Sequence, residues 1–222
     1  MLLGLVLATV VPLWRGLPAV IGVFRPLTVW RINPLWFVVA ILWPILFSAA
    51  FVTTKALVLG EPLSLLSSGA ELLGQPSFLA TVFIAALIGE IVWVGYAIAN
   101  LGRMRSRVIS ALIVGAVWGL WWLPMSYFEI GIVPGLTLAS LWMSMTGVAF
   151  FCAFFDALTR SGLVIFAMQF CFNSSVVAFP LLPIHAGPWA FEAYSAAYMI
   201  VGFLFVAILL PRLESSRSEQ EA

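Results

Sequence analysis

One carboxylate lies in the middle of an apolar run that has the composition of a membrane-spanning helix. Glu90 belongs to the run at about 79–98, and Val94, one helical turn further on, is apolar and offers it no counter-charge. A lone glutamate at membrane depth costs several kcal/mol unless it is protonated or has a partner inside a helix bundle. Glu90 therefore marks a candidate functional site.

The sequence after Glu90 adds positive charge and then aromatic bulk. A short turn carries Arg103, Arg105 and Arg107, and the apolar run that follows ends in LWWLP (120–124). In this ending Trp122 is an indole donor late in the helix, and the proline after it interrupts the backbone hydrogen bonds.

The stretch 89–124 resembles the CPBP family, the intramembrane glutamic endopeptidases that include the type II CAAX prenyl proteases. GEIVWVGY (89–96) and LWWLP keep the frame of the first two motifs of that family, with Trp93, Gly95 and Tyr96 in place. The resemblance implies a bundle of transmembrane helices over about 79–182 and a peptidase site inside the membrane.

The residues that the resemblance makes catalytic are mostly replaced. Aligned without a gap, Gly89 stands at the first, catalytic Glu of the motif and Glu90 at the second. Val94 stands at the motif Arg, and Trp122 stands at the first motif His. A one-residue slip would move Glu90 onto the first Glu, but it would rotate the following residues by about 100° around the helix and leave both histidines absent.

A second polar pair lies in the apolar run at about 161–182. Gln169 and Asn173 are four residues apart and so share one face of a helix. The resemblance matches them to the last family motif, HxxxN, with Gln in place of His. Counted from the cytoplasmic ends of their spans, they lie within about one or two helical turns of Glu90 in depth, so the geometry allows a shared polar pocket.

The composition defines the protein class. The chain has 222 residues, of which 64% are hydrophobic and 9% are charged, and its mean hydropathy is +1.14. Soluble domains average about 25% charged residues, so the sequence predicts an all-α, polytopic membrane protein. We expect one transmembrane domain over 1–210 and a polar, disordered tail over 211–222.

Hydropathy predicts about seven spans. The first, 1–14, covers only about 20 Å of a core about 30 Å thick, and a late start codon would explain its length. No basic residues precede it and no small-x-small site follows it, which disfavours a cleaved signal peptide. The other spans are expected at about 34–54, 79–98, 108–127, 135–155, 161–182 and 190–210, with an interfacial helix within 55–77.

The charges fit this layout. Alternating the loops between two sides places all the arginines on one side and leaves only Lys55 on the other. The arginines are Arg15, Arg25, Arg31, Arg103, Arg105, Arg107, Arg160, Arg212 and Arg217. The positive-inside rule then predicts a plasma (inner) membrane protein with its N-terminus outside and its C-terminus in the cytoplasm.

The sequence offers little support for metal, cofactor or nucleic-acid binding. Cys152 and Cys171 lie in apolar runs, and His185 lies in a predicted loop. Without a Cys/His cluster or a glycine-rich phosphate loop, we expect no metal site, no cofactor and no nucleic-acid partner.

We therefore predict a pseudoenzyme, a degenerate CPBP member that binds a membrane protein or a prenylated or otherwise lipidated peptide in the former active-site cleft, with lipids around it. One alternative is a working endopeptidase in which Glu90 acts with the amides of Gln169 and Asn173, which polarise a carbonyl. The other is a small-molecule carrier in which Glu90 is a proton or cation site, although neither inverted repeats nor paired broken helices are evident.

Overall fold

The computed structural model describes residues 2–102, 105–128 and 133–221 and, within them, all side chains except those of residues 2–5, 126 and 216–221. The fold is all-α: 82% of the chain is helical, and no strand occurs in the described ranges. The predicted fold class is thereby confirmed.

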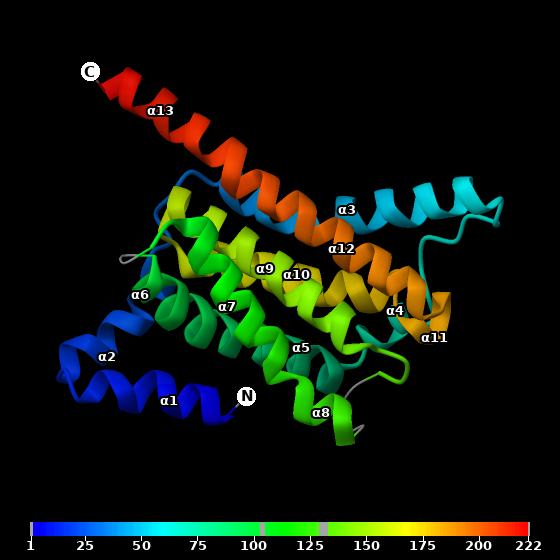
Figure 1. Cartoon of the computed structure of the whole chain (residues 1–222), viewed down its shortest axis with the longest axis horizontal. Coiled ribbons are helices and arrows are strands. Elements are labelled where there is room, and N and C mark those ends of the chain that lie inside the picture. The colour runs from blue at the N-terminus through cyan, green and yellow to red at the C-terminus, as the bar shows by residue number, and fades with distance from the viewer. Residues whose placement is uncertain (1, 103–104, 129–132, 222) are drawn as a thin grey trace.

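Six helices are long and apolar enough to cross a membrane. They are α3 (Leu35–Leu59), α5–η2–α6 (Pro76–Leu101), α7 and the start of α8 (Arg107–Met125), α9 (Leu138–Thr159), α10–α11 (Gly162–Ala186) and α12–η3–α13 (Pro188–Ser215). Each contains one of the last six spans predicted from hydropathy, apart from residues at the ends. α9 and α10 lie in the middle of the bundle, with α3 and α12 on one side and α5 and α7 on the other (Figure 1).

The first predicted span is different. Residues of this region form two short helices, α1 (Leu2–Leu13) and α2 (Leu17–Phe24), followed by the 3-10 turn η1 (Arg25–Thr28). Gly16, at φ 91°, makes the turn between α1 and α2, which pack on one another and on η2 (Figure 1). Twelve residues of α1 extend about 18 Å, too short to cross a core of about 30 Å. The described residues thus contain six membrane-length helices, roughly consistent with the predicted total of about seven spans.

Two other segments depart from the prediction. α3 continues to Leu59, and the expected interfacial helix is reduced to the four residues of α4 (Gly69–Leu72). Just before it, Ser67 hydrogen-bonds the last carbonyl groups of α10 through its backbone N–H and its hydroxyl. The polar tail, for which the sequence predicts disorder, continues α12 as the helix α13 (Leu210–Glu221).

Local sequence explains where the central helices begin. Ser106, Thr137 and Ser161 precede α7, α9 and α10. Each side-chain oxygen accepts a hydrogen bond from the backbone N–H three residues later, at 3.3, 3.1 and 3.4 Å. Such N-caps satisfy donors that the first turn of a helix leaves free.

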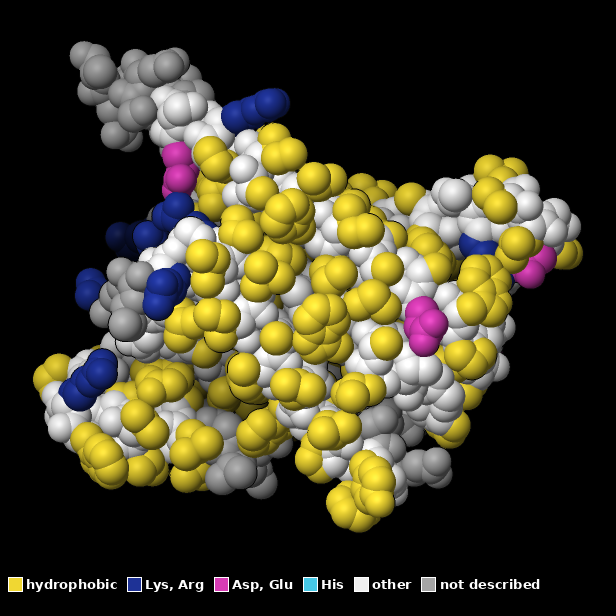
Figure 2. All heavy atoms as spheres, viewed as in Figure 1, with side chains coloured by type: hydrophobic (Ala, Val, Ile, Leu, Met, Phe, Trp, Pro, Cys, Tyr) yellow, Lys and Arg dark blue, Asp and Glu magenta, His cyan; other side chains and the backbone are white. Residues whose placement is uncertain are grey.

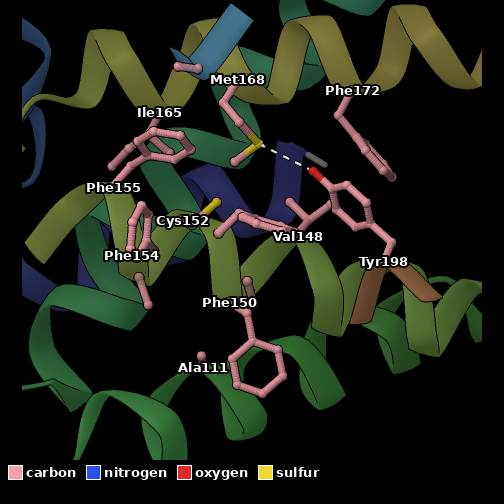
Figure 3. Packing of buried hydrophobic residues seen from close by; sticks show 14 of the residues in the cluster. Ala111, Val148, Phe150, Cys152, Phe154, Phe155, Ile165, Met168, Phe172 and Tyr198 are labelled. Atoms are coloured by element: carbon pink, nitrogen blue, oxygen red, sulfur yellow. Dashed lines mark hydrogen bonds between the residues drawn. The ribbon is translucent and has the colours of Figure 1, made fainter. Parts of the chain in front are cut away.

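The core forms around α9, most of whose residues are buried. Phe155 of α9 lies beside Ile165 of α10, whereas Phe150, on another side of α9, points toward Ala111 of α7 (Figure 3). The hydroxyl of Tyr198 in α12 lies 3.8 Å from the sulfur of Met168, within reach of a weak hydrogen bond. Tight interdigitation of this kind holds helices together in lipid, where burial of apolar surface gives little advantage.

Glycines allow α9 to approach its neighbours closely. A Cβ atom at Gly115 of α7 would lie 2.5 Å from Cα of Thr146 in α9. On α9 itself, a Cβ atom at Gly147 would lie 3.0 Å from the backbone nitrogen of Met199 in α12. Neither position has room for a side chain, so both contacts depend on glycine.

We expect Gly115→Ala to lower the free energy of unfolding by about 1–3 kcal/mol, because the added methyl group would push α7 away from α9. Unfolding of the purified protein in detergent, titrated with sodium dodecyl sulfate, measures this change. Gly22→Ala is the control, since no atom lies within 4 Å of a Cβ atom there. Equal stability of the two variants would contradict the close approach.

Candidate functional site

Glu90 and Gln169 meet inside the bundle. Glu90 is the first residue of η2 (Glu90–Ile98) and is 1% exposed, and Gln169 of α10 is 2% exposed. The amide nitrogen Nε2 of Gln169 donates a hydrogen bond to Oε2 of Glu90 at 3.4 Å. The tertiary structure therefore joins two of the residues that the sequence places at one depth.

Gly89 makes room for the amide of Gln169. A Cβ atom at Gly89 would lie 2.5 Å from Oε1 of Gln169 and 3.4 Å from the ring of Trp118. Any side chain at position 89 would therefore displace the amide that contacts Glu90. The glycine at this position and the buried amide are two parts of one packing arrangement.

The other oxygen of Glu90 lies over the start of α10. A Cβ atom at Gly162, the first residue of that helix, would be 2.7 Å from Oε1 of Glu90. The N-terminal end of a helix carries partial positive charge, which favours a carboxylate there. Within the described part of the chain, no Lys or Arg forms an ion pair with Glu90.

The helix that carries Glu90 has an unusual winding. η2 is a π-helix, with hydrogen bonds to the carbonyl five residues back, whereas the sequence suggests an ordinary α-helix. Within it Val94 is 2% exposed and packs in the core, and Trp93 stacks on Trp118 with ring centroids 5.4 Å apart. π-Helical turns occur frequently at functional sites.

An apolar cavity of about 320 Å³ lies next to this pair. Residues of α5, α7, α9, α10 and α12 line it. Three of the sequence-predicted positions contribute to the lining: Trp122, Gln169 and Asn173. Glu90, Gly89 and Val94 do not, so Gln169 is the residue that touches both the cavity and the carboxylate.

The polar groups of the cavity are uncharged. The indole nitrogen Nε1 of Trp122 is buried without a hydrogen-bond partner. Asn173 has no hydrogen bond to another residue in the described ranges, and the hydroxyl of Ser144 is shared with Ser195 at 2.9 Å. Amide and indole groups donate hydrogen bonds but do not transfer protons at neutral pH.

The described residues of the cavity wall supply no group for acid–base catalysis. None of the described side chains that line it is ionisable, and His185 lies elsewhere, in α11 (Pro183–Ala186). Asp156, near the end of α9, is paired with Arg160 at 3.1 Å and lines a different recess. Among the residues described, no group of three His, Cys, Asp or Glu side chains could hold a metal ion.

Most residues of the cavity wall could not be predicted from the sequence. Phe78, Thr81, Val82 and Ala85 of α5 line it, together with Phe191 of α12. These residues differ in no visible way from the other apolar residues of their helices. Only the angles at which the helices pack decide which of them face the cavity.

A double-mutant cycle tests the contact between Gly89 and Gln169. We expect Gly89→Ala to destabilise the wild-type protein, and to cost about 1 kcal/mol less in a Gln169→Ala background, where the amide no longer obstructs the methyl group. The free energy of unfolding in detergent is the measurement. Gly22→Ala combined with Gln169→Ala provides the additive control, and additivity in the first cycle would refute the contact.

Comparison of the chain with protein-family models, with curated proteins and with solved structures found no match.

Proposed function

We propose that this protein is a catalytically degenerate member of the CPBP family that binds an apolar part of a membrane partner in the cavity without cleaving it. The partner is a membrane-protein segment or a lipidated peptide. The observation that carries this proposal is the cavity lining: it is apolar, with uncharged hydrogen-bonding groups and no ionisable side chain among the residues that form it.

The dimensions of the cavity support a binding role. Its volume of about 320 Å³ lies within the range of small-molecule and cofactor sites, which are mostly apolar with a few placed polar groups. Thr81 lines the cavity and is also exposed, so the cavity reaches the surface of the bundle along α5. At membrane depth that surface faces lipid chains, which suits a partner that is itself embedded in the membrane.

The position of Glu90 supports the absence of catalysis. General-base catalysis requires the base to lie within hydrogen-bond reach of the proton it removes. Gln169 lines the cavity and Glu90 does not, and the motif positions Gly89 and Trp122 carry no carboxylate and no imidazole. A ligand in the cavity would meet amides and an indole before it met the carboxylate.

We propose that the arginine-bearing end of the bundle is cytoplasmic. The Lys and Arg side chains visible in Figure 2 gather mainly at the left end of the molecule, and a smaller basic patch lies at the right. With six crossings beginning at α3, the segments before α3 and after α12 lie on the same side. This layout also places the N-terminus on the cytoplasmic side, because α1 is too short to cross the membrane, whereas the sequence predicts an N-terminus outside.

Blocking the cavity tests the binding role. We expect Ala85→Phe to weaken capture of the partner about tenfold, since it places a ring where the ligand lies. Photo-crosslinking in membranes, with a diazirine-bearing prenylated peptide as the probe, measures this capture. Ala80→Phe is the matched control, because Ala80 is on the same helix but exposed and outside the cavity. Equal labelling of the two variants would contradict the proposal.

Glu90→Gln tests the absence of chemistry. We expect this variant to crosslink like the wild type, because the carboxylate does not line the cavity. We also expect neither protein to cleave prenylated CAAX peptides or a membrane-peptide library in liposomes, beside an intact family member as the positive control. Cleavage by the wild type that disappears in Glu90→Gln would establish the rival function, a working peptidase.

A further inference from the structure

A second recess lies at the arginine-bearing end of the bundle, away from the apolar cavity. It has a volume of about 240 Å³ and lies where α6 (Ala99–Leu101) ends, α7 begins and α9 ends. Four polar residues line it: Arg107, Ser110, Asp156 and Arg160. The rest of the lining is apolar or glycine. The recess thus contains two guanidinium groups and one carboxylate, and the remainder of its wall is uncharged.

Among the described residues, most of the N–H donors of both guanidinium groups have no partner. Arg107 reaches the carboxylate of Glu214 in α13 through Nη1 at 2.8 Å, and Arg160 reaches Asp156 through Nη1 at 3.1 Å. In the described part of the chain, neither group makes a hydrogen bond through Nε or Nη2. A guanidinium has five N–H donors in a fork that matches the oxygens of a phosphate group. The two side chains are 37% and 68% exposed, so these donors are accessible.

The backbone of Arg160 is unusual. It caps the C-terminal end of α9 in the left-handed conformation, at φ 52°, and is the one non-glycine residue with positive φ among those described. Glycine is favoured at such a cap, and a residue with a side chain costs about 1 kcal/mol there. Position 160 therefore carries an arginine although its backbone conformation favours glycine, and the arginine side chain lines the recess.

The recess lies at the ends of two membrane-length helices, where lipid headgroups are expected. Arg107 is the first residue of a membrane-length helix, and Arg160 directly follows the end of another. Figure 2 shows that most of the visible Lys and Arg side chains lie at this end of the molecule. A basic surface of this kind attracts anionic lipids, and basic pockets between transmembrane helices on the cytoplasmic side hold their headgroups.

We propose that this recess binds the phosphate group of an anionic phospholipid, with Arg160 and Arg107 as the donors. The acyl chains of the lipid would lie along the apolar outer surface of the neighbouring helices. The site is independent of the apolar cavity and of the function proposed for it. Inorganic phosphate shares the chemistry of the headgroup, so the test has to separate the two.

Arg160→Lys tests the site because it leaves the net charge unchanged and again places a non-glycine residue in the left-handed conformation. Lysine keeps the positive charge but loses the planar fork that binds two phosphate oxygens. Native mass spectrometry of the purified protein, titrated with phosphatidylglycerol and separately with phosphatidylcholine, measures lipid affinity. We expect the wild type to prefer phosphatidylglycerol and Arg160→Lys to bind it about fivefold more weakly. Arg105→Lys, at an exposed arginine outside the recess, should change this affinity less than about twofold.

Two results would overturn the proposal. The first is that Arg160→Lys binds phosphatidylglycerol with wild-type affinity. The second is that Arg105→Lys lowers this affinity as much as Arg160→Lys does. Either result would mean that lipid binding depends on the general surface charge and not on this recess. In a third arm, excess inorganic phosphate is added to the wild type. Retention of the lipid supports a headgroup site, whereas displacement that depends on Arg160 assigns the recess to soluble phosphate instead.

Discussion

Close packing around α9 is the constraint on which the rest of the structure depends. In a lipid environment, apolar side chains gain little by leaving the lipid, so helices must be held together by dense contact and by buried hydrogen bonds. Gly115 and Gly147 bring α7 and α12 against opposite sides of α9, where no side chain would fit. Residues of α5 and α10 complete the wall of the cavity together with residues of these three helices.

The buried carboxylate of Glu90 is accommodated by small residues and dipoles, and no positive charge of the described residues is paired to it. Gly162 lets its oxygen approach the start of α10, and Gly89 lets the amide of Gln169 lie beside it. Each of these contacts joins helices that are distant in sequence. The polar cluster thus stabilises the bundle, and stabilisation of the bundle alone is sufficient to account for a carboxylate at this depth.

The two hollow regions of the bundle have opposite chemistry. The cavity beside Gln169 is apolar and uncharged, which suits an apolar ligand, because an ionised group would lose its hydration there without compensation. The recess beside Arg160 is lined by two guanidinium groups and one carboxylate, at the ends of membrane-length helices. A protein with both features would bind apolar groups of its membrane environment in the cavity and charged groups in the recess.

The sequence by itself determined the fold class, six of the helices and the charge asymmetry of the chain, because these follow from hydropathy, span length and the positions of arginines. It also placed Glu90 and Gln169 at one depth, since depth is counted along a helix. It did not determine that Glu90 lies behind Gln169, that η2 is a π-helix or that α1 stops short of crossing. Those features depend on how each helix is rotated and wound against its neighbours, and such rotation is decided by tertiary contacts between residues far apart in the chain.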